Sequence, residues 1–394
     1  MAVTDSANVE YSKNRADYRV VSDLMEGNAR TIASRYLRQG TYENTTKFEI
    51  RQHISDFHPY TSRLLSNLVG MLYRDPEAIQ RSLPSNVVPQ VFFRNAGRRG
   101  EGFNQLVEEF ALNTLAFNAS GFIVTPQQSR IPNLSIVSPI NVPRWNDTRT
   151  VVTSHMTAPG NSITQDEEMM KVWVAYAPDG FEIFKQERRG KTKKDVRISQ
   201  QDYDHTFTDG NGNEIAPAQR IGFWADASLG AQIAHQHLAL YRLRSGRDVS
   251  VNEALRSAAI QTGTGNDTDF AEAIKQTFKN DNPFVPYSKD IGEHKPLSLP
   301  TGPLEEAREV IKEKEDQLNR IVGNFADESL QTATEIRVRS ETGVEAILST
   351  LANFMETNET LMLRIVAQAF NRNVTDQQLQ RINVTYPTSF ISSE

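Results

Sequence analysis

The chain of 394 residues contains no cysteine. Disulfide bonds, thiolate zinc sites and cysteine nucleophiles are therefore excluded. The sequence also lacks a run of about 18 apolar residues, which a membrane-spanning helix needs, and its first residues lack the apolar core of a signal peptide. We expect a soluble protein that is made in the cytoplasm and has no membrane contact.

Hydrophobic residues are scarce, at 38% of the chain, and 43 basic against 49 acidic residues give a net charge of −6. The low apolar content favours an elongated subunit, or one that buries part of its surface against copies of itself. Proteins that wrap nucleic acid need a surplus of lysine and arginine for phosphate contacts. The charge balance argues against that class, but it is compatible with a protein past which DNA slides.

The run "RGKTKK" at 189–194 ends like a phosphate-binding loop. That motif needs a glycine five residues before Gly190, where Lys185 stands. A charged strand precedes the run, which favours a basic hairpin tip. Such a tip is either a solvated turn or a contact for an acidic partner or a phosphate backbone. Its charges come from Arg188, Arg189, Lys191, Lys193 and Lys194.

Two further patterns resemble metal sites and are incomplete. "DGNGNE" at 209–214 begins like a calcium loop, but Glu214 replaces the sixth-position glycine and Arg220 replaces the final glutamate. A hairpin turn is the favoured interpretation. His235 and His237 are two residues apart on a predicted helix and point away from each other. We expect no metal, no cofactor and no catalytic residues, and hence no enzyme.

Hydrophobic periodicity divides the chain into helical and β-rich parts. The stretch 82–100 reads as loop, and a β-rich insert covers about 121–224 with hairpin turns at "APDG" and "DGNGN". A short strand is predicted near 284–287 and another within 381–387. Helices are predicted at 16–36, 47–73 with a break at His58-Pro59, 101–119, 227–260 with a break near Ser245-Gly246, 301–323 and 332–371.

The order of these elements predicts an architecture. Helices 101–119 and 227–260 read as an antiparallel pair capped by the β-rich insert, and two long helices follow, joined by the polar loop "NFADESLQ". Thr332 and Glu335 form a Thr-x-x-Glu capping box, which predicts that the second long helix starts there. The apolar stripes of the two long helices are too narrow for burial on all sides, so neighbouring copies in a closed ring would complete the burial.

The ordered segments resemble those of tailed-bacteriophage portal proteins over most of the chain. "HPYTSRLLSNLVGMLYRDP" is similar to the N-terminal helix of such portals, and "GEGFNQLVEEFALNTLAFNASGFIVTP" to a first stem helix that enters the clip. The returning stem helix is matched by "LGAQIAHQHLALYRLRSGRDVSVNEALRSAAI", and the tunnel-loop helices by "LEEAREVIKEKEDQLNRIV" and "TATEIRVRSE". Within the returning helix, a Tyr-Arg-x-x-Ser-x-x-Asp core is formed by Tyr241, Arg242, Ser245 and Asp248.

The resemblance implies an α+β portal fold with long helices, a β-rich clip and a mixed α/β wing, in an elongated subunit of a ring. The crown is expected to be reduced or absent. The implied regions are an N-terminal helical wing (1–100), first stem helix (101–119), β-rich clip (120–223), second stem helix (227–260), wing β segment (261–300), long helices (301–371) around a tunnel loop (about 323–331), and a C-terminal strand and tail (372–394).

The implied function is a head-to-tail connector ring, with twelve copies expected, that conducts double-stranded DNA during packaging and ejection. Terminase large subunit, head–tail adaptor, major capsid protein and scaffolding protein are the implied partners, and the virion vertex is the implied location after assembly in the host cytoplasm. Arg242, Arg244 and Arg247 would face the bore or pair with the next subunit. The tunnel loop would be formed by Asn324, Phe325, Asp327, Glu328 and Ser329.

Three alternatives stay open from the sequence. The tunnel-loop segment, acidic and free of lysine and arginine, suits a low-friction constriction but is also typical of an exposed interhelical loop. The whole chain could form another ring-forming head–tail adaptor or tail component. A metal-dependent nucleic-acid enzyme with unrecognised carboxylates is the third alternative.

Overall fold

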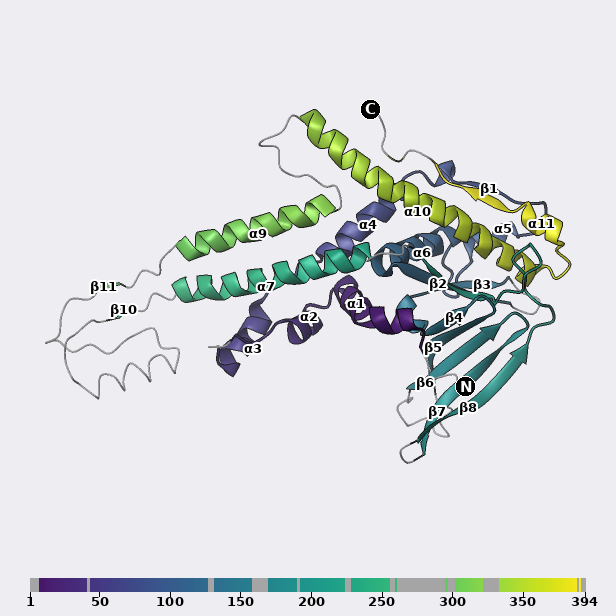
Figure 1. The fold of residues 1–394 in the computed structure, drawn as a ribbon, viewed down its shortest axis with the longest axis horizontal. Helices are drawn as coiled ribbons and strands as arrows, with labels where there is room; N and C mark the ends of the chain where they lie inside the picture. The colour runs from purple at the N-terminus through teal and green to yellow at the C-terminus, as the bar shows by residue number, and fades with distance from the viewer. Residues whose placement is uncertain are drawn as a thin grey trace. The chain divides into compact units, whose positions relative to one another are not determined.

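In the computed structural model, the chain divides into two compact units, which we call the α/β unit and the helical unit. The α/β unit contains Met1–Glu26, Pro59–His235 and Arg320–Glu394, and the helical unit contains Gly27–His58 and Gln236–Asn319 (Figure 1). The structure describes residues 7–40, 43–126, 131–157, 169–189, 192–223, 228–255, 259–260, 295–296, 302–321, 333–387 and 390.

The N-terminal helices are shorter than the sequence predicted. Instead of one helix at 16–36, α1 (Val9–Glu26) and α2 (Ala29–Tyr36) are separated by Gly27 and Asn28. Gly27 has φ +68°, a conformation that favours glycine, and the Asn28 side chain accepts a hydrogen bond from the Thr31 N–H at 3.1 Å. The predicted break at His58-Pro59 is confirmed, because α3 (Thr45–Ile54) and α4 (Tyr60–Leu72) lie on either side of it.

The segment after α4, of which 82–100 was predicted to be loop, contains three short elements. They are η1 (Pro76–Ala78), β1 (Gln80–Ser82) and α5 (Gln90–Arg94). Strand β1 pairs antiparallel with β12 (Asn383–Thr385), with Arg81 opposite Val384. The partner of β1 lies some 300 residues away along the chain, so local sequence periodicity carries no sign of it. The predicted C-terminal strand is confirmed.

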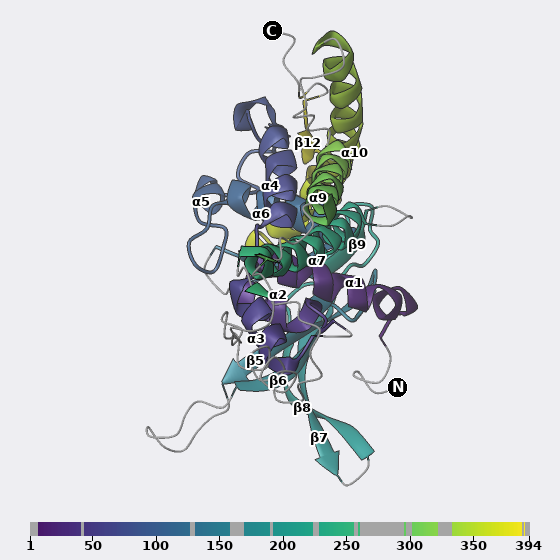
Figure 2. The same ribbon diagram turned by 90° about the vertical axis from the view of Figure 1, so that its left-hand side faces the viewer.

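The predicted β-rich insert is confirmed and forms two antiparallel sheets in the α/β unit (Figure 2). The three-stranded sheet has the order β3-β2-β9 and the five-stranded sheet has the order β4-β5-β6-β7-β8. The predicted "APDG" hairpin is present, with Ala177 paired to Gly180. The strands are β2 (Ala119–Thr125), β3 (Asn133–Val137), β4 (Arg144–Asn146), β5 (Arg149–Thr157), β6 (Met169–Ala177), β7 (Gly180–Arg189), β8 (Thr192–Asp202) and β9 (Ala218–Gly222), with η2 (Pro139–Asn141) between β3 and β4.

The "DGNGN" run forms the predicted hairpin turn, in which Gly210 and Gly212 have φ +88° and +86°. The Asp209 carboxylate accepts hydrogen bonds from the backbone of Asn211 at 2.7 Å and of Asn213 at 3.2 Å, so the turn itself uses the carboxylate. The amide of Gln368 binds both backbone groups of the neighbouring Thr208: its oxygen accepts from the N–H at 2.9 Å and its nitrogen donates to the carbonyl at 2.7 Å.

The core of the α/β unit lies between the three-stranded sheet and the helices α6 (Phe103–Phe117) and α10 (Ala333–Phe370). Phe110 of α6 packs against Phe122 of β2 and Phe354 of α10, with ring centroids 6.2 Å apart in each case. Both helices were predicted, within two residues of their observed bounds. The short helix α11 (Asp376–Gln380), which follows α10, was not predicted.

The helical unit is built around α7 (Leu229–Leu255), whose residues from 236 onward belong to it. It also contains α2, α3, β10 (Ala259–Ile260), β11 (Lys295–Pro296) and most of α9 (Gly302–Ile321). The predicted break near Ser245-Gly246 is wrong, because α7 continues through both residues. Ser245 is buried and hydrogen-bonded to Ser55 at 2.7 Å, which stabilises the helix at that point. The predicted strand near 284–287 lies outside the described residues.

None of the described helices is both long enough and apolar enough to cross a membrane.

Candidate functional site

Helix α7 carries the three arginines that the sequence analysis singled out, and its partner in the helical unit is α9. Strand β10 follows α7 in the chain, and strand β11 precedes α9. The two strands pair antiparallel, with Ala259 opposite Pro296. Arg244 forms an ion pair with Glu315 of α9. Arg244 lies near the middle of α7 and Glu315 lies near the middle of α9, as an antiparallel helical hairpin requires. Figure 1 shows the two helices side by side.

The predicted antiparallel pairing of 101–119 with 227–260 stays a prediction, because α6 belongs to the α/β unit and α7 from Gln236 onward belongs to the helical unit. Helix α6 packs on β2, β3 and α4, since nine of its fifteen residues are buried and need cover on several sides. It meets α7 at one junction, where the Ser228 hydroxyl donates to the Ala116 carbonyl at 2.9 Å. A Cβ on Gly230 would lie 2.1 Å from the same carbonyl oxygen, so the two backbones touch there.

Each of the three arginines binds an acceptor of its own chain. Arg242 Nε donates to the Tyr36 carbonyl at 3.0 Å, Arg244 pairs with Glu315, and Arg247 pairs with Asp248 at 2.9 Å. The sequence identified these cations but not their acceptors. Contact with the bore or with a neighbouring subunit stays a prediction for all three.

The side of α7 opposite α9 binds α3 through small polar and aromatic groups. Ser245 and Ser55 share a hydrogen bond of 2.7 Å, and the ring of Tyr241 packs edge-on against Phe57 with centroids 5.8 Å apart. Tyr241 and Ser245 are buried. Two members of the Tyr-Arg-x-x-Ser-x-x-Asp core therefore hold α3, while Arg242 binds the end of α2.

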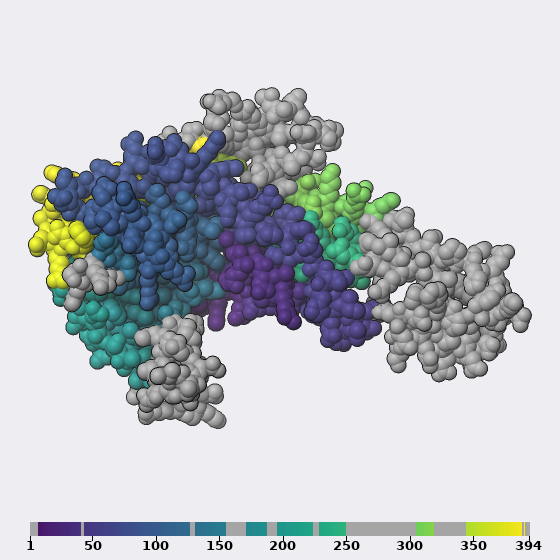
Figure 3. Space-filling view, turned by 180° about the vertical axis from the view of Figure 1, so that it is seen from behind, coloured from purple at the N-terminus to yellow at the C-terminus, as the bar shows by residue number. Residues whose placement is uncertain are grey.

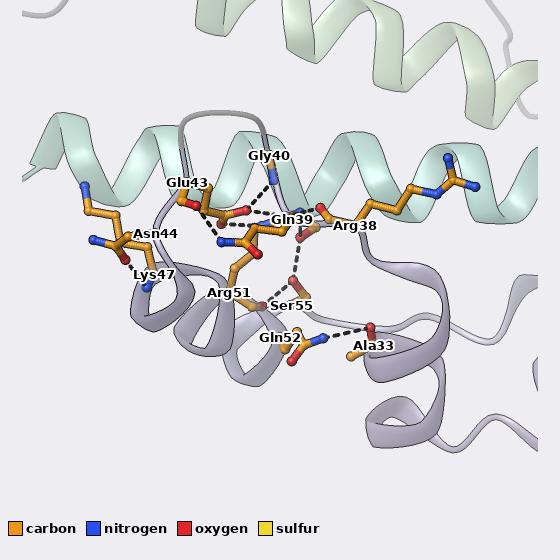
Figure 4. A network of polar contacts seen from close by, with 11 residues as sticks. Ala33, Arg38, Gln39, Gly40, Glu43, Asn44, Lys47, Arg51, Gln52 and Ser55 are labelled. Atoms are coloured by element: carbon orange, nitrogen blue, oxygen red, sulfur yellow. Dashed lines mark hydrogen bonds and ion pairs between the residues drawn. The ribbon is translucent and has the colours of Figure 1, made fainter.

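Arg51 of α3 organises a polar network that links α3 to the end of α2 (Figure 4). Its guanidinium donates to both carboxylate oxygens of Glu43, at 2.8 and 2.7 Å, and to the Arg38 carbonyl. The side chains of Arg51 and Glu43 are only 11% and 14% exposed, and the hydrogen bond from Arg51 lowers the pKa of Glu43. A paired acid and base eight residues apart across a turn has no local sequence signature, so sequence reasoning missed this pair.

The two histidines of α7 have separate surroundings. His235 is exposed and pairs with Asp17 at 3.0 Å. His237 is 2% exposed and its ring stacks on Phe57 with centroids 5.0 Å apart. Burial lowers the pKa of His237 to about 4. Across the described residues, no group of three His, Asp or Glu side chains is placed to hold a metal ion.

The low pKa of His237 predicts a pH-dependent stability. In the unfolded chain the histidine has a pKa of about 6.5, so it takes up a proton more readily than the buried His237 of the folded protein. The free energy of unfolding is therefore highest above pH 6.5 and falls as the pH drops toward 4. Between pH 7 and pH 4.5 we expect the titration of His237 to lower the free energy of unfolding by about 2 kcal/mol. Chemical denaturation at both values should show that His237→Gln lacks this part of the pH dependence, whereas His235→Gln retains it. An equal pH dependence in wild type and His237→Gln would contradict the assignment.

The predicted basic hairpin tip is confirmed as a hairpin. Strands β7 and β8 pair up to their ends, where Arg188 is opposite Lys193 and Arg189 is opposite Thr192. A phosphate-binding loop would instead lead into a helix. Gly190 and Lys191 lie outside the described residues, and contact of the tip with a partner stays a prediction.

The predicted tunnel-loop residues Asn324, Phe325, Asp327, Glu328 and Ser329 and the cap residue Thr332 lie outside the described residues. The helices on either side are described: α9 ends at Ile321 and α10 begins at Ala333. The predicted start of the second long helix is confirmed, and Glu335 lies in its first turn.

The sequence matches no protein-family profile and no curated protein. Two solved structures are similar in fold over most of the chain. The first is the neck of an empty GTA particle computed with C6 symmetry, with TM-score 0.39 and 12% identity over 90% of this chain and 87% of that chain. The second is the neck of a native GTA particle computed with C12 symmetry, with TM-score 0.37 and 11% identity over 91% and 89%. Both TM-scores lie below 0.5, so neither likeness shows a function for this chain.

Proposed function

We propose that this chain is the subunit of a phage portal ring that conducts double-stranded DNA. The helical hairpin of α7 and α9 is the observation that supports the proposal most strongly. Residues 229–235 at the start of α7 and 320–321 at the end of α9 belong to the α/β unit, and the rest of both helices belongs to the helical unit. Both helices thus have one end in the α/β unit, and a pair of short antiparallel strands lies in the connection between them. This is the arrangement that we expect of a portal stem.

This proposal changes the region boundaries implied by the order of sequence segments. On this proposal the stem consists of α7 and α9 rather than of 101–119 and 227–260, because α6 is packed within the α/β unit. The clip then falls to the connection between the two helices, which includes β10 and β11. The β-rich insert at 120–223 joins the wing, since β2 packs on α6 and α10.

The conduction of DNA requires weak rather than strong phosphate contacts. Each lysine or arginine fixed on a phosphate releases counterions and adds affinity, and a ring multiplies the effect by its number of copies. The three arginines of α7 are engaged with Tyr36, Glu315 and Asp248, which lowers their capacity to hold the backbone of passing DNA. The acidic segment 323–331 connects the stem to α10 and suits the constriction. On this proposal the subunit is not an enzyme, and terminase and the head–tail adaptor dock at the clip.

Ring formation tests the proposal directly. Purified protein is expected to form an assembly many times the 44.4 kDa mass of the subunit, with a central hole. Light scattering after size exclusion gives the mass, and negative-stain imaging shows the hole. A stable monomer at micromolar concentration, with no rings at the salt concentrations used for DNA packaging, would contradict the proposal.

A further inference from the structure

The helical unit has three layers, with α7 between α9 and the α2–α3 segment. Arg244 of α7 contacts Glu315 of α9, while Ser245 contacts Ser55 and Arg242 contacts Tyr36 on the other side. Figures 3 and 4 show the same order, with α9 on one side of α7 and α2–α3 on the other. The unit therefore has two outer faces that point in opposite directions.

The outer face of α9 is acidic. Ile311 and Leu318 are buried and Glu315 points to α7, which fixes the inner side of the helix. Residues 305, 309 and 313 are spaced by four, so they share one face, and this face lies opposite the buried side. Val310 at its edge is 37% exposed. The exposed acids of this face, which we call the acidic face, are Glu305, Glu306, Glu309 and Glu313; the exposed bases beside them are Arg308 and Lys312, so the face keeps a net negative charge.

The outer face of α2–α3 is basic and partly apolar. Ile50 and Ile54, one turn apart on α3, are 42% and 43% exposed, although isoleucine is one of the residues most often buried in proteins. Lys47 lies on the same side as these two, three and seven residues earlier. Glu43 is engaged by Arg51 and so neutralised. The exposed cations of the segment, which together with the two isoleucines we call the basic face, are Arg30, Arg35, Arg38 and Lys47, and they outnumber Glu49, the exposed acid of α3.

We propose that the acidic face of one subunit packs against the basic face of the next. The inference rests on the proposed ring, and it assigns the contact between copies. The two faces carry opposite charge, and each presents exposed β-branched side chains that a neighbour would bury. Because they lie on opposite sides of one unit, the contact is head-to-tail, which is the type that generates closed rings.

Charge reversal on each face gives a specific test. The variant Glu309→Lys/Glu313→Lys has two like-charged faces and should require a roughly tenfold or higher protein concentration to form rings. Arg30→Glu/Lys47→Glu should do the same. Both substitutions place an acid in the first turn of a helix, where it favours folding. When the two variants are mixed, reversed faces meet each other and native faces meet each other, so rings of alternating subunits should form again.

The controls separate this contact from general charge effects. Glu77→Lys/Glu214→Lys changes the net charge by the same amount as Glu309→Lys/Glu313→Lys, at exposed positions of the α/β unit, and should leave ring formation unchanged. Circular dichroism and thermal unfolding establish that each variant folds. Light scattering then reports the ring fraction of each variant alone and of the equimolar mixture.

The outcomes distinguish this inference from the proposed function. If the wild type forms no rings, the portal proposal fails. If the wild type forms rings and the reversed variants form them equally well, the assigned contact is wrong. Rings that are lost in each variant and absent from the mixture would show that the two faces do not contact each other in the ring.

Discussion

Replacement of Arg81 by methionine is expected to reduce the free energy of unfolding by about 3–5 kcal/mol. Arg81 of β1 pairs with Glu359 of α10, whose side chain is fully buried. The second oxygen of that carboxylate accepts a hydrogen bond from the Tyr386 hydroxyl at 2.7 Å, and Tyr386 is joined to Tyr73 at 2.8 Å. Removal of the guanidinium leaves a buried charge without a counter-charge. Urea unfolding followed by circular dichroism measures the loss.

A double variant and a surface variant make this prediction specific. Arg81→Met/Glu359→Gln removes the charge but keeps an acceptor for Tyr386, so it should be more stable than Arg81→Met alone. Arg149→Met breaks a pair with Glu182 whose side chains are 47% and 29% exposed, and should change stability by less than about 1 kcal/mol. A comparable loss in Arg149→Met and Arg81→Met would show that burial of Glu359 is not the cause.

Gly230→Ala should cost about 3 kcal/mol and should separate the start of α7 from the end of α6. The added Cβ would lie 2.1 Å from the carbonyl oxygen of Ala116 and 2.6 Å from its Cα and carbonyl carbon. These are backbone atoms, so rotation of a side chain cannot relieve the overlap. The Ser228 hydroxyl, which donates to the same carbonyl, would lose its position. Hydrogen exchange should accordingly rise around 114–118 and 228–233.

Gly246 provides the matched control, because it lies in the same helix and the same substitution adds the same atom. A Cβ at Gly246 would have no neighbour within 4 Å. Alanine favours helices over glycine by about 1 kcal/mol, so Gly246→Ala should stabilise the protein slightly. If Gly230→Ala also stabilises it, the close approach of the α6 and α7 backbones is wrong.

Local patterns predicted most of the longer elements but not their partners. The apolar stripe of α6 and the glycine-containing turns are set by residues within a few positions of one another. The partner of a helix depends on side chains distant in sequence. Periodicity therefore identified α7 as a helix, whereas the ion pair of Arg244 with Glu315, which joins α7 to α9, has no sign in the local sequence.

In the candidate site, too, the residues were predicted but their partners were not. Arg242, Arg244 and Arg247 were recognised because a cluster of cations is visible along one helix. The acceptors Tyr36 and Glu315 are distant from them in sequence and have no distinguishing motif. The Arg51–Glu43 pair was missed because a single acid and a single base are common in any surface loop. Their burial, which makes the pair important, appears only in three dimensions.

The contact between Gln368 and Thr208 has a consequence for the chemical ageing of the protein. The side-chain amide of Gln368 binds Thr208 as the peptide group of a neighbouring strand would. Its oxygen accepts from the Thr208 N–H and its nitrogen donates to the Thr208 carbonyl. Deamidation would convert the donor nitrogen into a second oxygen, which would face the Thr208 carbonyl with like partial charge. Gln368 is 5% exposed, so the new carboxylate would also be poorly hydrated. Slow hydrolysis of one amide would thus loosen the attachment of the Asp209 turn to α10.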